Sequence, residues 1–254
     1  MLVARGLDVL VTDVDEGAAS ETAAVLGSRA WPMAQDVRDP GSHRAVAAAA
    51  AERGPLEVWV NNAGVLRTQK AWEHRDDDVR MLVEVNLLGV LWGSRAAVEA
   101  MRPQGGDIVN MASMSAFGAV PGLAVYGATK HAVRAFTESL QGDLDDARIP
   151  IRTHAICPDG VDTGMVRERR GDADAAIIFS APRLLKPEEI AAAVGSVIGR
   201  RKPLLSIPRT RMVLTRGMAL FPQLSLRLLP LFKKAGEKKR PSAGKPADGS
   251  AQVP

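Results

Sequence analysis

One tyrosine and one lysine stand four residues apart near the middle of the chain, and their spacing suits proton transfer. Tyr126 and Lys130 would lie on one face of a helix, a turn apart. A phenol titrates at about pH 10, so it is a poor base unless a nearby cation favours the phenolate. Ser113 precedes the tyrosine by thirteen residues, and its hydroxyl can donate to a carbonyl or alcohol oxygen. The three side chains together predict acid–base chemistry at a carbon–oxygen centre.

Strands that alternate with helices must position these side chains. Short apolar runs predict strands at 7–12, 30–37, 56–60, 107–112, 151–157 and 204–207. Helices are expected at 15–26, 40–52, 79–101 and 124–147, with Asp39 and Pro40 as N-cap and first residue of the second. This alternation predicts a single Rossmann-type α/β domain, a doubly wound parallel sheet covered on both faces.

Three further motifs accompany the Ser113–Tyr126–Lys130 spacing. They are NNAG at 61–64, VNLLG at 85–89 and PDGVDT at 158–163. In this order and at these spacings, the four signals resemble the short-chain dehydrogenase/reductase family over about residues 1–207. The resemblance implies hydride transfer between NAD(P) and a secondary alcohol or ketone. Tyr126 would be the general acid/base, Ser113 would hold the reacting oxygen, and Lys130 would also bind the cofactor ribose.

The resemblance also assigns roles around these three side chains. Asn86 would help hold a water that links Lys130 to solvent. Pro158, Val161 and Thr163 would lie on the nicotinamide side of the cofactor. The family usually has glycine directly after this proline, whereas Asp159 stands there in this chain, which puts the close backbone approach at this point in question.

Residues that follow the first strands are the candidates for binding the adenosine part of the cofactor. At a strand end, Asp13 could accept hydrogen bonds from the ribose hydroxyls and would repel a 2′-phosphate, which favours NAD over NADP. A helix N-cap or a solvated loop acid is the alternative for Asp13. Asp36 and Val37 resemble the family's adenine-contacting pair, although a capping aspartate explains Asp36 equally well. The resemblance places three more residues beside the adenosine ribose: Asn62, Ala63 and Gly64.

The front of the chain departs from the expected fold. A dinucleotide fold begins with a strand, a glycine-rich turn and a helix, yet no TGxxxGxG-like turn precedes Asp13, and Ala4 to Gly6 resembles the end of that first helix. The first strand belongs mid-sheet, so its loss would leave unpaired backbone groups in the core. We expect that the true start lies upstream and that Met1 is internal; the alternative is a short protein that is unstable or lacks cofactor.

Composition excludes several classes of protein. The 254 residues, 46% hydrophobic, can bury one sizeable core. The single cysteine, Cys157, fits a reducing cytoplasm. We find no uninterrupted apolar run of eighteen residues and no signal-peptide pattern at the N-terminus. The histidines lack metal-ligand spacing, so no metal is expected: His43, His74, His131 and His154.

Charge is divided unevenly along the chain. Residues 201–254 hold 12 Lys and Arg against 2 Asp and Glu, whereas residues 1–200 carry a net charge of −6. The basic charge is confined to a terminal segment without base-stacking aromatics, which argues against nucleic-acid binding.

Residues beyond the Rossmann-type domain (1–207) form a different kind of segment. An apolar and basic amphipathic extension covers 208–240, and 241–254 is expected to be disordered. Residues 212–240 would suit peripheral contact with a membrane, or equally an apolar strip that packs on a neighbouring subunit. Before it, the segment 164–186 resembles the family's substrate lid, and its apolar run favours a lipophilic substrate.

The sequence thus supports a cytoplasmic, NAD-dependent oxidoreductase, with peripheral membrane contact as an open alternative. Its partner would be a small-molecule alcohol or ketone, and the resemblance implies a homo-dimer or homo-tetramer. A catalytically inactive relative that acts as a binding or scaffold protein is the other hypothesis, because the phosphate-binding turn is missing.

Overall fold

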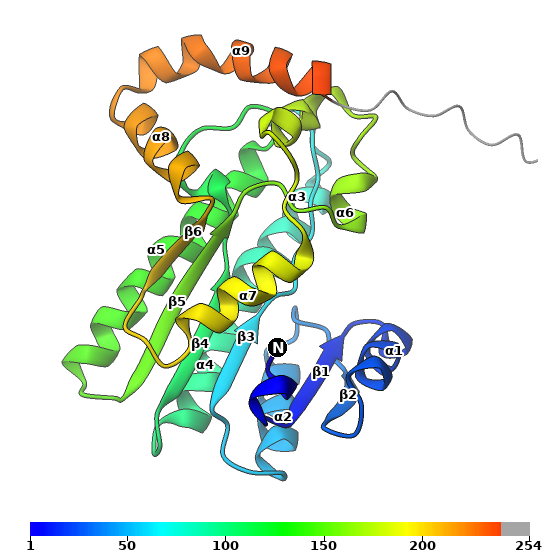
Figure 1. The fold of residues 1–254 in the computed structure, drawn as a ribbon, viewed down its shortest axis with the longest axis vertical. Helices are drawn as coiled ribbons and strands as arrows, with labels where there is room; N and C mark the ends of the chain where they lie inside the picture. Colours follow the sequence, from blue (N-terminus) through cyan, green and yellow to red (C-terminus); the bar gives the residue numbers. More distant parts are fainter. Residues whose placement is uncertain (240–254) are drawn as a thin grey trace, which may run out of the picture.

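Parallel strands and helices alternate along residues 1–239, the part of the chain that this computed structural model describes (Figure 1). The predicted disordered segment 241–254 lies outside the described residues. The strands are β1 (Val9–Asp13), β2 (Ala30–Ala34), β3 (Val58–Asn61), β4 (Gly106–Met111), β5 (Ile151–Pro158) and β6 (Leu204–Ile207). Each strand predicted from the sequence is present, which confirms the α/β class.

The four helices predicted from the sequence are present. In chain order, the helices and helical turns are η1 (Val3–Arg5), α1 (Glu16–Leu26), α2 (Pro40–Ala51), α3 (Asp76–Val83), η2 (Glu84–Leu88), α4 (Gly89–Met101), η3 (Met114–Phe117), α5 (Ala124–Asp146), α6 (Gly164–Arg167), η4 (Ala173–Ser180), α7 (Pro187–Val197), α8 (Arg209–Leu220) and α9 (Pro222–Lys239). The structure thus adds α7, α8 and α9, which were not predicted. The long helix expected at 79–101 begins earlier, at Asp76, because three consecutive aspartates occupy its first turn, where the helix dipole favours negative charge.

The strands form two sheets rather than one. The larger has the order β3-β4-β5-β6, the smaller contains β1 and β2, and all pairs are parallel. Within residues 1–239 no strand pairs with both β1 and β3, and a cavity of about 730 Å³ lies between residues of these two strands. The cavity stands where the 3-2-1-4-5-6 strand order places its first strand. The predicted interruption of the sheet is therefore present.

The first residues end a helical turn, as the sequence suggested. Gly6 has φ of +84°, a left-handed conformation that glycine adopts without strain, and its N–H donates to the carbonyl of Val3. The Arg5 side chain donates to the Gly195 carbonyl at 2.6 Å, so this turn rests on α7.

Helices cover both faces of the larger sheet (Figure 1). On one face, α2, α4 and α5 bury a cluster that contains Val46, Ala97, Met101, Leu144, Trp59, Ile108 and Ile151. On the other, α7 packs Ala193, Val194 and Val197 against Val109, Met111, Ile156 and Leu205. Successive residues of β4 and β5 point to opposite clusters, as the two-residue period of a strand requires.

A buried amide network ties the central strands to the helices behind them. Asn61 donates from Nδ2 to Asn110 Oδ1 at 2.7 Å and to Ser94 Oγ at 3.1 Å. Asn110 in turn donates to Thr137 Oγ1 at 3.0 Å. Asn61, the first residue of NNAG, therefore braces the sheet.

One helical stretch, Asp76–Met101, is long and apolar enough to cross a membrane by length and composition alone. Its apolar residues face the interior: Leu82, Val90, Ala97 and Met101 are all buried against other elements. The stretch therefore serves as a core helix of the α/β fold.

The C-terminal extension forms a helical hairpin beyond the carboxyl ends of the strands (Figure 1). Its second helix, α9, packs along η4. The contact is close at Gly236, where a Cβ would lie 1.8 Å from the Ala176 carbonyl oxygen. The sequence suggested an apolar and basic extension here, and the structure shows which face of it is packed inward.

Candidate active site

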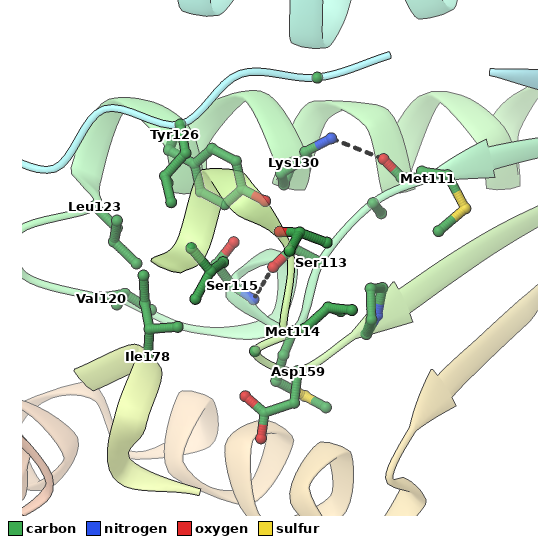
Figure 2. Close-up of a pocket in the computed structure, with 18 of the residues that line it drawn as sticks. Met111, Ser113, Met114, Ser115, Val120, Leu123, Tyr126, Lys130, Asp159 and Ile178 are labelled. Atoms are coloured by element: carbon green, nitrogen blue, oxygen red, sulfur yellow. Dashed lines mark hydrogen bonds between the residues drawn. The ribbon is translucent and has the colours of Figure 1, made fainter. Parts of the chain in front are cut away.

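A cavity of about 500 Å³ opens at the carboxyl ends of β4 and β5. Three of the four predicted catalytic residues line it, Ser113, Tyr126 and Lys130, whereas Asn86 does not. Ser113 follows β4, while Tyr126 and Lys130 stand one turn apart on α5 (Figure 2). The remaining walls are largely apolar and include Leu123 and Ile178. The hydroxyl groups of Ser113 and Tyr126 and the amine of Lys130 thus lie in the wall of an otherwise largely apolar chamber.

Ser113 is held in place by its neighbours. Its backbone is extended, it caps η3, and its Oγ accepts from the Ser115 N–H at 3.2 Å. The Ser113 side chain lies close enough to the Tyr126 phenol to lower its pKa. Ser115 Oγ lies buried in the same wall and has no hydrogen-bond partner within the described chain, which leaves one more hydroxyl facing the chamber.

The electrostatics of the tyrosine differ from the sequence prediction. Burial raises the pKa of Tyr126, and the neighbouring Ser113 side chain only partly opposes this. Lys130 Nζ lies 5.7 Å from the Tyr126 ring centroid and donates to the Met111 carbonyl at 2.8 Å. The pKa of Tyr126 is therefore raised overall by burial, and the lowering predicted from Lys130 is not seen.

Lys130 itself is strongly affected by its surroundings. Burial lowers its pKa to about 8. The amine is therefore poised between its charged and neutral forms close to neutral pH, and it can exchange a proton with a neighbouring group.

Asn86 lies in η2, a π-helical segment, and is fully buried. Its Oδ1 accepts from the Val65 N–H and its Nδ2 donates to the Val65 carbonyl, both at 2.8 Å. Both polar groups of the side chain are thus engaged with the loop that follows NNAG. A Cβ on Gly64 would lie 3.3 Å from Asn86 Oδ1 and 3.7 Å from Lys130 Nζ, so glycine permits this close packing.

The segment after β5 is fixed by backbone contacts. The Leu185 N–H donates to the Gly160 carbonyl, and the Asp162 N–H donates to the Leu185 carbonyl, each at 2.8 Å. Pro158, Val161 and Thr163 line the chamber as a result.

Asp159, which replaces the usual glycine, points away from Tyr126 (Figure 2). It pairs with Arg211 of α8 at 2.7 Å, with both side chains largely buried. Burial raises the pKa of Asp159, and the guanidinium opposes that shift. The ion pair of Asp159 with Arg211 thus holds α8 beside the chamber. Sequence reasoning missed Arg211, because only the fold brings it to Asp159.

The residues predicted for the adenosine side line the second cavity, between β1 and β3. They are Asp13, Asp36, Val37, Asn62, Ala63 and Gly64. The two helix caps nearby are Asp15 and Asp39, which accept from backbone N–H groups of α1 and α2. Asp13 and Asp36 are therefore not the N-caps of α1 and α2, whereas the alternative of a solvated loop acid stays open for Asp13, which is exposed.

Asp36 has a partner that the sequence did not suggest. The Arg38 guanidinium donates to both carboxylate oxygens, at 2.6 to 3.0 Å, and lowers the pKa of Asp36. Asp13, by contrast, accepts from the Asp15 N–H at 3.0 Å and pairs with no cation in the described residues.

The two cavities meet at residues that line both, Val60, Asn62, Gly64 and Val65. Together they offer acid–base groups at one end and a free carboxylate at the other, as the nicotinamide and adenosine ends of a dinucleotide require. Residues 1–239 hold no glycine-rich turn for the pyrophosphate between these ends. The chemistry of the two cavities suits the nicotinamide and adenosine ends of a dinucleotide, whereas the described residues offer no such turn for the pyrophosphate between them.

A parallel sheet flanked by helices, with Ser113, Tyr126 and Lys130 at its carboxyl edge, is the architecture of a dinucleotide-dependent oxidoreductase. The sequence pattern of the short chain dehydrogenase family matches residues 1–174. The chain belongs to this family.

Known relatives agree with that assignment. The chain is 33% identical to the 3-beta-hydroxysteroid dehydrogenase of Comamonas testosteroni over 202 residues, 76% of this chain and 80% of the relative. It is 32% identical to the 3-oxoacyl-[acyl-carrier-protein] reductase FabG of Salmonella typhimurium over 197 residues, again 76% of this chain and 80% of the relative.

Two further similarities bear on length and ligand. The probable oxidoreductase EphD of Mycobacterium tuberculosis is 31% identical over 79% of this chain, which spans only 36% of that protein. A crystal structure of a short chain dehydrogenase/reductase from Burkholderia phymatum in complex with NAD superposes with a TM-score of 0.76 at 27% identity, and the match covers 85% of each chain.

Proposed function

We propose that this protein oxidises a lipophilic secondary alcohol, or reduces the corresponding ketone, with NAD as the preferred cofactor. The observation that carries the proposal is the Ser113–Tyr126–Lys130 set at the wall of an apolar chamber. The free carboxylate of Asp13 supports NAD over NADP, because it would accept from ribose hydroxyls and repel a 2′-phosphate.

Each side chain has a defined task in this proposal. Tyr126 removes the hydroxyl proton of the alcohol, and Ser113 holds the same oxygen through its own hydroxyl. Lys130 passes the proton onward, since its pKa of about 8 permits exchange near neutral pH. Asn86 keeps the loop at Val65 in place, and beside it a water would link Lys130 to solvent. NAD, when bound, supplies the nicotinamide that accepts the hydride.

The chamber supports a lipophilic substrate. A volume of about 500 Å³ suits a drug-sized molecule. Its walls come from the lid segment, through Val166 and Ile178, and from the hairpin, through Leu229 and Phe232. The names of two relatives, a hydroxysteroid dehydrogenase and an oxoacyl reductase, likewise describe hydroxyl and keto substrates.

The test compares wild type with Tyr126→Phe in two assays. NADH binding, followed by fluorescence, should be retained in the variant, because the lost hydroxyl serves proton transfer. Turnover of a panel of lipophilic secondary alcohols with NAD should fall by about 10²–10⁴-fold. Thr137→Ser, a conservative change in the buried network behind the chamber, is the control and should keep most activity. Equal turnover by wild type and Tyr126→Phe would contradict the proposed function.

A binding or scaffold role is the second candidate, favoured by the lack of a pyrophosphate-binding turn in the described residues. NADH binding should be measured on the 254-residue chain and on a product of the nearest upstream in-frame start. Binding by either form supports the oxidoreductase. A folded protein that binds NADH in neither form would favour the scaffold role.

A further inference from the structure

The hairpin of α8 and α9 carries most of the large apolar side chains that this protein exposes. Six of the eleven such side chains in the described residues fall within this short stretch, and each is 49–77% exposed: Val213, Leu214, Leu220, Phe221, Leu226 and Leu231. Single exposed apolar residues are ordinary, whereas a gathered set marks an interaction surface.

The two faces of α9 have different partners. Leu229 and Gly236 are buried on the inner face, which packs along η4. The outer face repeats at helical spacing and exposes Leu226, Leu231 and then Lys234. Apolar side chains thus occupy the outer face near the turn of the hairpin, and basic ones occupy it further on.

Positive charge accompanies the apolar side chains. Residues 209–239 contain eight Lys and Arg and a single acid, Glu237. Arg209, Arg227, Lys234 and Lys238 are exposed and form no ion pair or hydrogen bond inside residues 1–239. Residues 1–200 carry a net charge of −6, so the basic hairpin contrasts with the rest of the described chain and would attract an anionic surface.

We propose that the α8–α9 hairpin docks on an anionic lipid bilayer. Leu220 and Phe221, at the turn, enter the boundary between headgroups and acyl chains, while Arg227, Lys234 and Lys238 contact lipid phosphates. A second copy of the chain is a weaker partner, because a symmetric contact would bring two equally basic hairpins together. A bilayer offers an apolar layer and negative charge at once.

The inner face of the same hairpin lines the active-site chamber, through Thr215, Leu229 and Phe232. Docking would therefore place the active-site chamber next to the bilayer, where lipophilic alcohols and ketones concentrate. This consequence rests on the proposed function, whereas the docking itself does not.

Co-sedimentation of the full 254-residue chain with vesicles tests the docking. We expect binding to phosphatidylcholine vesicles that contain phosphatidylglycerol, and at least about tenfold weaker binding to pure phosphatidylcholine. The double variant L220S/F221S should lose about tenfold in partitioning, and R227Q/K234Q should lose the preference for phosphatidylglycerol.

Matched controls remove the same kinds of side chain elsewhere. V25S/W72S removes two exposed apolar side chains from the body of the protein, and R44Q/R95Q removes two exposed cations there. Both should bind as wild type does. Loss of binding in these controls equal to that in the hairpin variants would overturn the proposal.

A reporter variant does not depend on removing the apolar side chains. F221W should show a blue-shifted emission with anionic vesicles and quenching by brominated acyl chains, whereas the native Trp31, Trp59, Trp72 and Trp92 should not be quenched. An F221W protein whose emission is no more quenched than that of wild type would overturn the proposal. So would hairpin variants that change the mass measured by light scattering while vesicle binding is absent, since a second copy would then cover this face.

Discussion

The two sheets of this protein differ in how firmly they are built. Residues of β4 and β5 are almost all buried between helices, and both strands are paired on each side. Neither β1 nor β2 has a buried residue, and β1 faces a cavity along one edge. The larger sheet carries Ser113 and supports the helix of Tyr126, whereas the smaller carries the carboxylates of the adenosine side.

This difference separates the two tasks of the site. Proton transfer needs fixed geometry, which the larger sheet provides through buried networks. In the proposed function, the adenosine end of the cofactor would contact Asp13 and Asp36, which follow the strands of the smaller sheet. A cavity separates this sheet from β3. Changes in the larger sheet should therefore affect turnover and global stability, while changes in the smaller one should affect cofactor affinity and local opening.

The largest expected effect follows from Lys130→Met. Turnover should fall by about 10²–10⁴-fold, because the proton path is cut. Burial lowers the lysine pKa from 10.5 to about 8, so the charged amine destabilises the folded state below about pH 8. The penalty disappears as the pH rises to 10.5.

Chemical denaturation should therefore show the variant equal to or more stable than wild type at pH 7, by up to about 3 kcal/mol. Loss of the bond to the Met111 carbonyl limits this gain. The advantage should shrink between pH 8 and 10.5. A variant less stable than wild type at pH 7 would contradict this account of Lys130.

Two substitutions compare a buried ion pair with an exposed one, Asp107→Asn in the larger sheet and Asp36→Asn in the smaller half. Asp107, at the start of the larger sheet, accepts from Arg152 at 2.9 and 2.8 Å and contacts His154 at 2.8 Å. Its removal should cost about 3 kcal/mol of unfolding free energy, roughly 150-fold in the equilibrium. The matched change Asp36→Asn breaks an exposed pair in the smaller half and should cost less than about 1 kcal/mol.

The contribution of Asp107 to the free energy of unfolding should depend on pH. Burial opposes ionisation of Asp107, but its partners outweigh this and lower the pKa from 3.8 to about 2. Its contribution is present above pH 3.8 and is lost as the pH falls towards 2. Urea unfolding at pH 7, 4 and 2.5 should therefore show wild type and Asp107→Asn converging. A constant difference would mean that the charge is not what stabilises this site.

Hydrogen exchange should separate the two sheets directly. Amides of β5 lie between two paired strands, whereas those of β1 and β2 belong to a two-stranded sheet without buried residues. We expect exchange at least about 100-fold faster in β1 and β2, because local opening there exposes little apolar surface. Mass-spectrometric peptides that cover 9–13 and 151–158 would measure the ratio, and equal rates would show that the halves unfold as one unit.

The smallest effect is expected from Asp13→Asn. The affinity for NADH should fall by about tenfold, because a charged acceptor for the ribose hydroxyls becomes neutral. NADPH affinity should stay constant or rise. Asp15→Asn removes the same charge two residues away and keeps a good helix cap, so it should leave both affinities unchanged. An equal loss for both variants would point to a general charge effect.

The arrangement of the sequence motifs accounts for much of this structure. Hydrophobic period and turn residues located the strands, since burial on both faces of a parallel sheet demands continuous apolar runs. The spacing of Ser113, Tyr126 and Lys130 placed them on one strand end and one helix face. Capping chemistry identified Asp39 at the start of α2, because the cap lies within a few residues of the groups that it satisfies.

Features that depend on distant contacts were not accessible in the same way. The ion pair of Asp159 with Arg211 joins residues 52 positions apart, and local rules contain no information about it. The direction of the Tyr126 pKa shift depends on how deeply the folded chain buries the phenol, which local spacing does not reveal.

The sequence by itself predicted the strands from hydrophobic period and turn residues, and its motifs gave the resemblance to the short-chain dehydrogenase family. The acid–base roles of Ser113, Tyr126 and Lys130 stay a prediction from that resemblance. Only the tertiary structure decided which carboxylates remain free, what Asp159 contacts and which face of the C-terminal hairpin is exposed. Those properties arise from packing between elements far apart in the chain, where burial and paired charges are set by the whole fold.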